Sequence, residues 1–160
     1  MKKSEVLILY KTLNKLGSLT GVKFSYAVAR NLNILKDEIE SLDKSMEPSE
    51  KFQEFDKERI KIVELHAEKD DNGKAKMEMA DNGAQQYVID PENKMFKKAF
   101  DALKIKHKEA VDARDKQVEE YTKLLASDSD VVLFKVKLED VPKEISAVQM
   151  AGIYDIVDGE

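Results

Sequence analysis

The chain has 160 residues, a hydrophobic fraction of 42%, a formal net charge of −5 and no cysteine. This length and hydrophobic content suffice for one domain over residues 1–160, and the acidic charge argues against general affinity for nucleic acid. The lack of cysteine excludes disulfides, thiolate metal sites and cysteine nucleophiles, and it is consistent with a cytoplasmic location.

The first part of the sequence has the apolar periodicity of amphipathic helices. It predicts a helix over 4–16, which ends at the glycine-containing linker 17–21. The apolar run 6–10 inside it is much shorter than the roughly 20 residues that a membrane span needs, so we expect no membrane helix. From 25 to 46 apolar residues recur in steps of four and three, the seam of a helix packed lengthwise on another. Pro48 ends this helix, and a third helix is expected after it.

Residues 68–93 contain turn and strand signals instead of helical periodicity. The turn formers are the triplets Asp71-Asn72-Gly73 and Asp81-Asn82-Gly83. Together with the β-favouring residues around Tyr87, they predict a small polar hairpin with strands at 74–80 and 84–89. Strands this short are not stable alone, so we expect the hairpin at the tip of the helices that flank it.

The segment after the hairpin predicts one long helix over 90–126. Asp90 and Pro91 are typical of a helix start, and the apolar residues form a nearly continuous stripe that includes His107. A helix of this length spans about 50 Å. Because it and the helix after Pro48 flank the hairpin, we expect the two to run antiparallel.

Residues 131–160 predict a C-terminal strand and helix. Apolar residues and lysines alternate over 131–138 in strand fashion, and Ser146 with Gln149 forms the capping box of a final helix. The strand needs a partner for its backbone groups. It pairs either inside the molecule, with 22–24 or the hairpin, or with a second copy across an interface, and the sequence leaves both open.

No arrangement of residues with a known chemistry is found in the sequence. The glycine-rich phosphate loops, the G-x-S-x-G elbow and the H-E-x-x-H zinc motif are absent. The two histidines, His66 and His107, lie too far apart on the predicted helices to share a metal ion. Neither acidic glycine turn has the ligand pattern of a calcium loop. We therefore expect no enzyme activity, no cofactor and no bound metal.

A lysine-rich stretch over 94–108 contrasts with the acidic C-terminus. It lacks the arginines of bidentate base recognition and the exposed aromatics of base stacking. We interpret it as a solvated helix face that can also steer an acidic partner. The expected partner is therefore a protein, and neither nucleic acid nor a membrane.

Four segments stand out by their order in the chain: Leu13-Asn14-Lys15-Leu16, Val22-Lys23-Phe24-Ser25-Tyr26-Ala27-Val28-Ala29-Arg30-Asn31, Glu68-Lys69-Asp70-Asp71-Asn72-Gly73 and Val136-Lys137-Leu138-Glu139-Asp140-Val141-Pro142. Together they resemble a family of small proteins encoded by tailed phages and prophages of low-GC Gram-positive bacteria. The resemblance covers most of the chain except the middle, where this sequence has a longer insert, and it supplies no catalytic residues. It implies a phage origin and a role in infection.

The expected fold is mainly α with minor β structure: an elongated bundle of long antiparallel helices, a polar hairpin tip (68–93) and a C-terminal strand and helix unit (131–160). The expected function is non-catalytic protein binding, as a phage-encoded inhibitor that docks on a host defence or nuclease complex in the host cytoplasm. The alternative is a structural accessory of the virion or of head and tail assembly, which forms homo-oligomers through the strand 131–138. The candidate partner-binding residues belong to the hairpin and the C-terminal unit: Asp71, Asn72, Asp81, Asn82, Tyr87, Phe134, Glu139, Asp140, Asp155 and Asp158.

Overall fold

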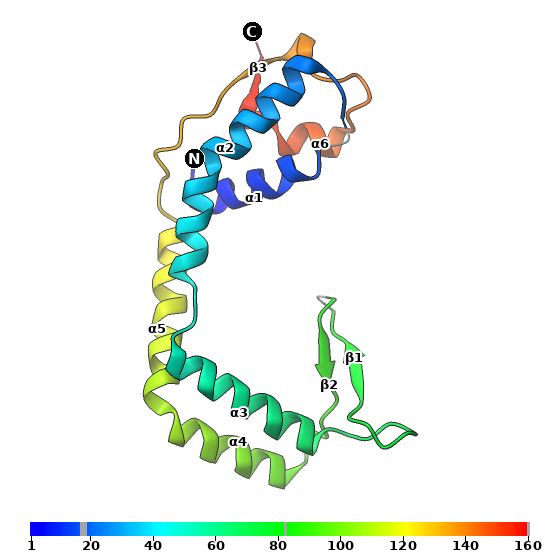
Figure 1. The fold of residues 1–160 in the computed structure, drawn as a ribbon, viewed down its shortest axis with the longest axis vertical. Helices are drawn as coiled ribbons and strands as arrows, with labels where there is room; N and C mark the ends of the chain where they lie inside the picture. The colour runs from blue at the N-terminus through cyan, green and yellow to red at the C-terminus, as the bar shows by residue number, and fades with distance from the viewer. Residues whose placement is uncertain (17–18, 82, 160) are drawn as a thin grey trace. The chain divides into compact units, whose positions relative to one another are not determined.

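A computed structural model describes residues 1–16, 19–81 and 83–159 of the chain (Figure 1). The described part is mainly helical with two small sheets of two strands each, so the predicted fold class is confirmed. Residue contacts form two compact units: a terminal unit of Met1–Glu47 and Val118–Glu160, and a middle unit of Pro48–Gln117. The single domain over 1–160 stays a prediction, because compact units need not fold separately.

The terminal unit begins with α1 (Lys3–Asn14), which packs on α2 (Val22–Ser45). The backbone N–H of Lys2 donates to the Glu5 carboxylate at 2.6 Å, a contact that stabilises the start of α1. The start of α2 follows Gly21, whose φ of 130° lies in the region that favours glycine. Both predicted helices are confirmed, with α2 starting three residues earlier than the apolar seam indicates.

The C-terminal part of the terminal unit contains two short strands. The strand β3 (Val136–Lys137) pairs in parallel with β4 (Val157–Asp158). The predicted strand over 131–138 is therefore shorter than expected, and its partner is the end of the chain. Pairing with 22–24 or with the hairpin is a wrong prediction, because 22–24 belongs to α2 and the hairpin forms a separate two-stranded sheet. The strand β4 lies where the sequence predicts the end of the final helix, which runs from Ser146 through Val157.

The predicted capping box of the last helix is present. The helix α6 (Ala147–Gly152) begins after Ser146, whose hydroxyl accepts from the Gln149 backbone at 3.2 Å, while the Gln149 side chain accepts from the Ser146 backbone at 2.9 Å. At Gly152 a Cβ would lie 2.8 Å from Cγ2 of Thr12, so a glycine lets α6 approach α1 closely. Short 3-10 helices lie on either side of α6: η1 (Leu138–Asp140) and η2 (Tyr154–Ile156).

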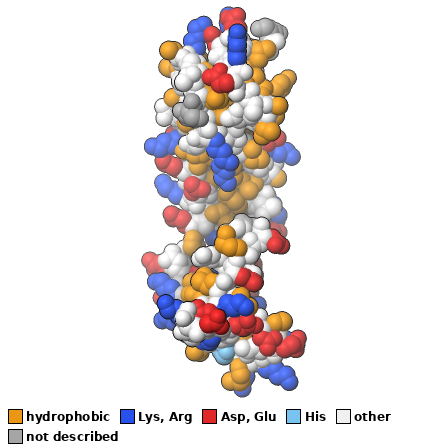
Figure 2. Space-filling model, turned by 90° about the vertical axis from the view of Figure 1, so that its right-hand side faces the viewer, with side chains coloured by type: hydrophobic (Ala, Val, Ile, Leu, Met, Phe, Trp, Pro, Cys, Tyr) orange, Lys and Arg blue, Asp and Glu red, His pale blue; other side chains and the backbone are white. Residues whose placement is uncertain are grey.

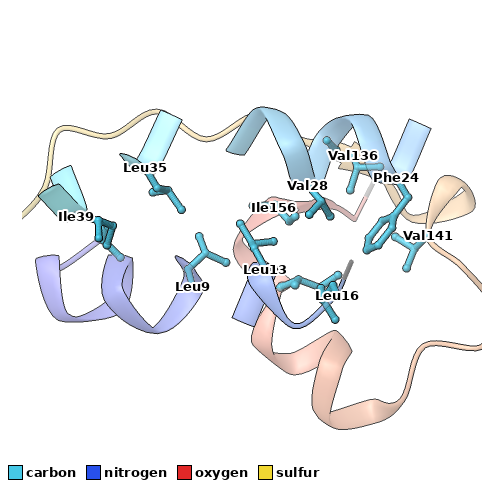
Figure 3. Close-up of a cluster of buried hydrophobic side chains, with 13 residues drawn as sticks. Leu9, Leu13, Leu16, Phe24, Val28, Leu35, Ile39, Val136, Val141 and Ile156 are labelled. Atoms are coloured by element: carbon cyan, nitrogen blue, oxygen red, sulfur yellow. The ribbon is translucent and has the colours of Figure 1, made fainter. Parts of the chain in front are cut away.

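The hydrophobic core of the terminal unit joins segments from both ends of the chain (Figure 3). It buries Leu9 and Leu13 from α1 and Leu35 from α2, together with Val136 and Ile156 from the C-terminal part. Full burial of a side chain of this size contributes about 1.5–3 kcal/mol. These contacts therefore hold the irregular C-terminal segment against α1 and α2.

The middle unit consists of a helix pair and a hairpin. The helices α3 (Glu50–His66) and α4 (Lys94–Lys106) pack against each other and run in opposite directions (Figure 1). Between them in the chain, β1 (Met77–Met79) and β2 (Gln85–Tyr87) form an antiparallel hairpin. Backbone hydrogen bonds of Glu68 tie the base of the hairpin together. The predicted hairpin is confirmed, with shorter strands than expected.

The predicted single helix over 90–126 is wrong at its start. The Asp90 carboxylate accepts from the Glu92 backbone at 2.9 Å, which stabilises a turn in place of a first helical turn. The helix α4 begins after Asn93, whose side chain accepts from the Phe96 backbone at 2.9 Å. The N-cap of this helix is therefore Asn93, which lies closer to the apolar stripe, and not Asp90 as the sequence predicts.

The same predicted helix is also wrong at His107, where it is interrupted. His107 has φ −109° and ψ 25°, which ends α4, and a new helix, α5 (Lys108–Leu125), follows. The His107 imidazole packs on Phe55 of α3, with 5.9 Å between the ring centroids, and lies 3.3 Å from the Glu58 carboxylate. These contacts of His107 with α3 accompany the break, so the continuous helix of about 50 Å does not form.

Candidate functional site

The terminal unit has a groove of about 350 Å³ where the start of α2 meets the segment that contains β3. This volume lies at the lower end of the roughly 300–1,000 Å³ of ligand pockets. Its apolar lining comes from α2 and from this segment: Val22, Tyr26, Phe134 and Val136. Its charged lining residues are Lys23, Lys135, Lys137 and Asp140. An apolar floor with charged residues around it is suited to bind an amphipathic ligand or segment.

Two aromatic rings line the groove and are contacted by an arginine. The rings of Tyr26 and Phe134 meet edge to face, with 5.6 Å between their centroids. The Arg30 guanidinium lies 4.5 Å from the Phe134 ring centroid and donates to the Tyr26 hydroxyl at 3.1 Å. Edge-to-face and cation–π contacts each contribute roughly 0.5–1.5 kcal/mol. These contacts fix the two rings relative to each other and to α2.

The segment that carries Phe134 is attached to α2 by a buried asparagine. Asn31 is fully buried, and its side chain accepts from the Phe134 backbone N–H and donates to the Phe134 carbonyl, both at 2.8 Å. It also donates to the Ala27 carbonyl at 3.0 Å. The side-chain amide pairs with Phe134 as a neighbouring strand would, so Asn31 positions one wall of the groove.

Asn31 is not among the candidate partner-binding residues chosen from the sequence, although its position on α2 indicates a buried contact. It lies one turn after Ala27 and one turn before Leu35, on the buried face of α2. A polar side chain on such a face must find hydrogen-bond partners inside the protein. An asparagine within the apolar stripe of a helix therefore indicates a contact with distant backbone.

Two lysines of the groove have polar partners within the terminal unit. Lys23 contacts both carboxylate oxygens of Asp140, at 3.0 and 3.2 Å. This hydrogen bond and the charge of Asp140 raise the pKa of Lys23 above its usual 10.5. Lys135 donates to the carbonyl of Asp155 at 2.6 Å. The raised pKa keeps Lys23 protonated at neutral pH.

Hydrophobic side chains at the edge of the groove are exposed to solvent. Val22 is 90% exposed and Tyr26 is 56% exposed. Figure 2 shows one face of the molecule, on which other exposed hydrophobic side chains lie among charged ones. Isolated exposed hydrophobic side chains are normal on protein surfaces. Val22 and Tyr26 differ because they border a groove whose floor is also apolar.

The structure brings some predicted partner-binding residues to the groove and leaves others apart. Phe134 and Asp140 line it, and Asp155 contributes its carbonyl to Lys135. Glu139 and Asp158 are exposed in the same unit. The remaining candidates belong to the middle unit: Asp71, Asn72, Asp81 and Tyr87. The candidate Asn82 falls outside the described residues.

Sequence reasoning missed the α2 side of the groove. The candidate residues chosen from the sequence do not include Val22, Lys23 or Tyr26, and 22–24 is considered there only as a possible strand partner. Their exposure depends on how the segment around Phe134 crosses α2, which no local pattern indicates.

No protein-family model, curated protein or solved structure matches this chain. The resemblance to small phage proteins therefore stays a prediction.

Two absences hold for the described part of the chain. Within residues 1–16, 19–81 and 83–159, no group of three or more His, Cys, Asp or Glu side chains could hold a metal ion. In the same residues, no helix is long and apolar enough to cross a membrane. The two histidines have separate neighbours: His66 packs on Phe96, and His107 packs on Phe55.

The middle unit contains a small charged cluster that gives a pH-dependent prediction. Lys106 donates to both Glu58 oxygens, at 2.7 and 2.8 Å. This hydrogen bond, with a further one from His107, holds the pKa of Glu58 below its usual 4.5. A carboxyl with a lowered folded-state pKa stabilises the protein above its unfolded pKa, and this stability is lost as the pH falls through the folded-state value.

We expect Glu58→Gln to lower the urea midpoint at neutral pH, and the difference from the original protein to shrink below about pH 4. Urea titrations followed by circular dichroism across this pH range measure the difference. Glu54→Gln, an exposed change one turn earlier in α3, is the control and should leave the midpoint unchanged. A difference for Glu58→Gln that persists at about pH 2 would contradict this ion pair.

Proposed function

We propose that the chain is a non-catalytic protein-binding protein and that the groove beside α2 is its docking site. The observation that carries this proposal is the exposure of Val22 and Tyr26 in a groove that the Tyr26 and Phe134 ring pair lines. Exposed apolar surface with a polar rim is typical of interaction sites. The contacts of Arg30 and Asn31 reduce the ordering that binding requires, because they already fix the floor and one wall.

The finer proposal is that the protein is a phage-encoded inhibitor that docks on a host defence or nuclease complex in the host cytoplasm. Its support is the resemblance of four segments to small phage proteins, together with the groove. A protein that acts by occupying a surface of a larger complex needs a preformed docking site and no catalytic residues. The groove is suited to that role.

The test is affinity capture of the tagged protein from infected host cells, with the bound proteins identified by mass spectrometry. We expect a host defence or nuclease complex to be retained, and Val22→Asp to reduce its recovery at least about 10-fold, because a carboxylate would lose hydration in an apolar contact. Aspartate at Val22 is compatible with folding, since a negative charge is favourable in the first turn of a helix.

Val148→Asp is the matched control for this capture. Val148 is 83% exposed and also lies in the first turn of a helix, α6, but it does not line the groove. This variant should retain the complex. Equal recovery with Val22→Asp would contradict the docking site, and recovery of capsid, neck or tail proteins would replace the inhibitor proposal by a role in particle assembly.

A further inference from the structure

The groove is positively charged in a protein that is negative as a whole. The protein has a formal net charge of −5. Three of the groove's lining residues are lysines, and one, Asp140, is an acid, which gives the lining a formal charge of +2. This local reversal of sign is the first indication of the partner's chemistry, because interfaces pair patches of opposite charge.

The lysines of the groove have donors left for a partner. An ammonium group has three N–H donors, and the hydrogen bond of Lys135 to the Asp155 carbonyl uses one of them. The Lys137 side chain is 70% exposed, and its ammonium forms a long ion pair with Glu139, 3.9 Å from the carboxylate oxygen, which is beyond hydrogen-bond distance and leaves its N–H donors to solvent. Lys135 and Lys137 can therefore pair with carboxylates that a partner brings.

The apolar lining of the groove indicates the second property of the partner, an apolar side chain. Val22, Tyr26 and Phe134 surround a volume of about 350 Å³, which has room for one bulky side chain. The Tyr26 and Phe134 rings already meet edge to face, and aromatic surface of this kind favours a further aromatic or a branched aliphatic contact.

We infer that the groove binds an acidic segment of another protein that carries one bulky apolar side chain. This inference rests on the proposed function and adds the chemistry of the partner. The apolar side chain covers the Tyr26 and Phe134 rings, and carboxylates beside it pair with Lys135 and Lys137. Because these lysines are exposed, salt weakens the attraction.

Synthetic peptides test the inference without knowledge of the natural partner. The probe is a fluorescein-labelled peptide with a central tryptophan and leucine between runs of aspartate and glutamate. One control peptide has lysines in place of the acids, and another has glycine and serine in place of tryptophan and leucine. Fluorescence anisotropy should show binding of the probe to the full chain, with each control peptide at least about 10-fold weaker.

Charge reversal in the protein should move the binding in the opposite direction. The double variant Lys135→Glu/Lys137→Glu is expected to weaken the acidic probe at least about 10-fold and to strengthen the lysine peptide. The matched control is Lys11→Glu/Lys143→Glu, which changes the net charge equally at exposed lysines outside the groove lining. It should leave the affinity for the probe within about 3-fold.

Failure of this inference is distinguishable from failure of the proposed function. No binding of the acidic probe, or equal binding of the lysine peptide, overturns the inference. Tighter binding of a single-stranded oligonucleotide than of the probe also overturns it. If a natural partner is captured and lost with Val22→Asp but retained by Lys135→Glu/Lys137→Glu, the proposed function stands and the acidic chemistry is wrong.

Discussion

Replacement of Phe24 by alanine is expected to lower the free energy of unfolding by about 4 kcal/mol. Phe24 is fully buried in the first turns of α2, and in Figure 3 it lies beside Val136 and Val141. The variant loses the apolar surface that the ring buries and leaves a cavity that its neighbours fill only in part. Urea denaturation followed by circular dichroism at neutral pH measures the change.

Val22→Ala is the control for this experiment. Val22 lies in the same part of α2 but is 90% exposed, so its truncation should change the free energy of unfolding by less than about 0.5 kcal/mol. A loss below about 1 kcal/mol for Phe24→Ala would show that Phe24 is not part of a packed core. Since Val136 lines the groove beside Phe24, we also expect Phe24→Ala to weaken the binding of the acidic probe.

The helices of this protein could be predicted where they depend on local sequence. The seam over 25–46 reproduces the buried face of α2 because one face of a helix repeats every three or four residues. Leu32 is one of the apolar residues of this seam. The structure leaves Leu32 partly buried, whereas its neighbour Asn31 is fully buried. The segment around Phe134, 103 residues away in sequence, provides the hydrogen bonds that make burial of an asparagine favourable.

The errors of the sequence analysis come from contacts between distant segments. The break at His107 has no proline or glycine to mark it and is accompanied by contacts with Phe55 and Glu58 of α3. The pairing of β3 with β4 involves only Val136–Lys137 and Val157–Asp158. A pattern this short cannot be recognised from periodicity, because a strand signal requires several alternating residues.

The candidate site was predicted in part for the same reason. Phe134 and Asp140 were selected from the composition of the C-terminal unit, and both line the groove. Val22 and Tyr26 on α2 could not be predicted as site residues from the sequence, because they line the groove only through the fold, which brings them together with Phe134. Whether a hydrophobic side chain on a helix is buried or exposed depends on which segment covers it, and here that segment comes from the other end of the chain.

Replacement of Asn31 by alanine is expected to lower the free energy of unfolding by about 3 kcal/mol. The change removes the hydrogen bonds to the Phe134 N–H and carbonyl and leaves both groups without their partner on α2. The segment around Phe134 should then separate from α2, so the affinity for the acidic probe should also fall. Asn33→Ala, an exposed change on the same helix, should alter neither quantity.

Asn31→Leu separates the loss of hydrogen bonds from the loss of volume. Leucine has the same branched skeleton of four side-chain heavy atoms as asparagine, with bulkier methyl groups, and it suits the buried face of α2. It therefore fills the site without restoring the pairing with Phe134. If the hydrogen bonds hold the segment, Asn31→Leu remains less stable than the original protein by at least about 1 kcal/mol, because a buried N–H and carbonyl stay unpaired. A leucine variant as stable as the original protein, with unchanged affinity for the probe, would mean that packing alone positions Phe134 and that Asn31 does not build the groove wall.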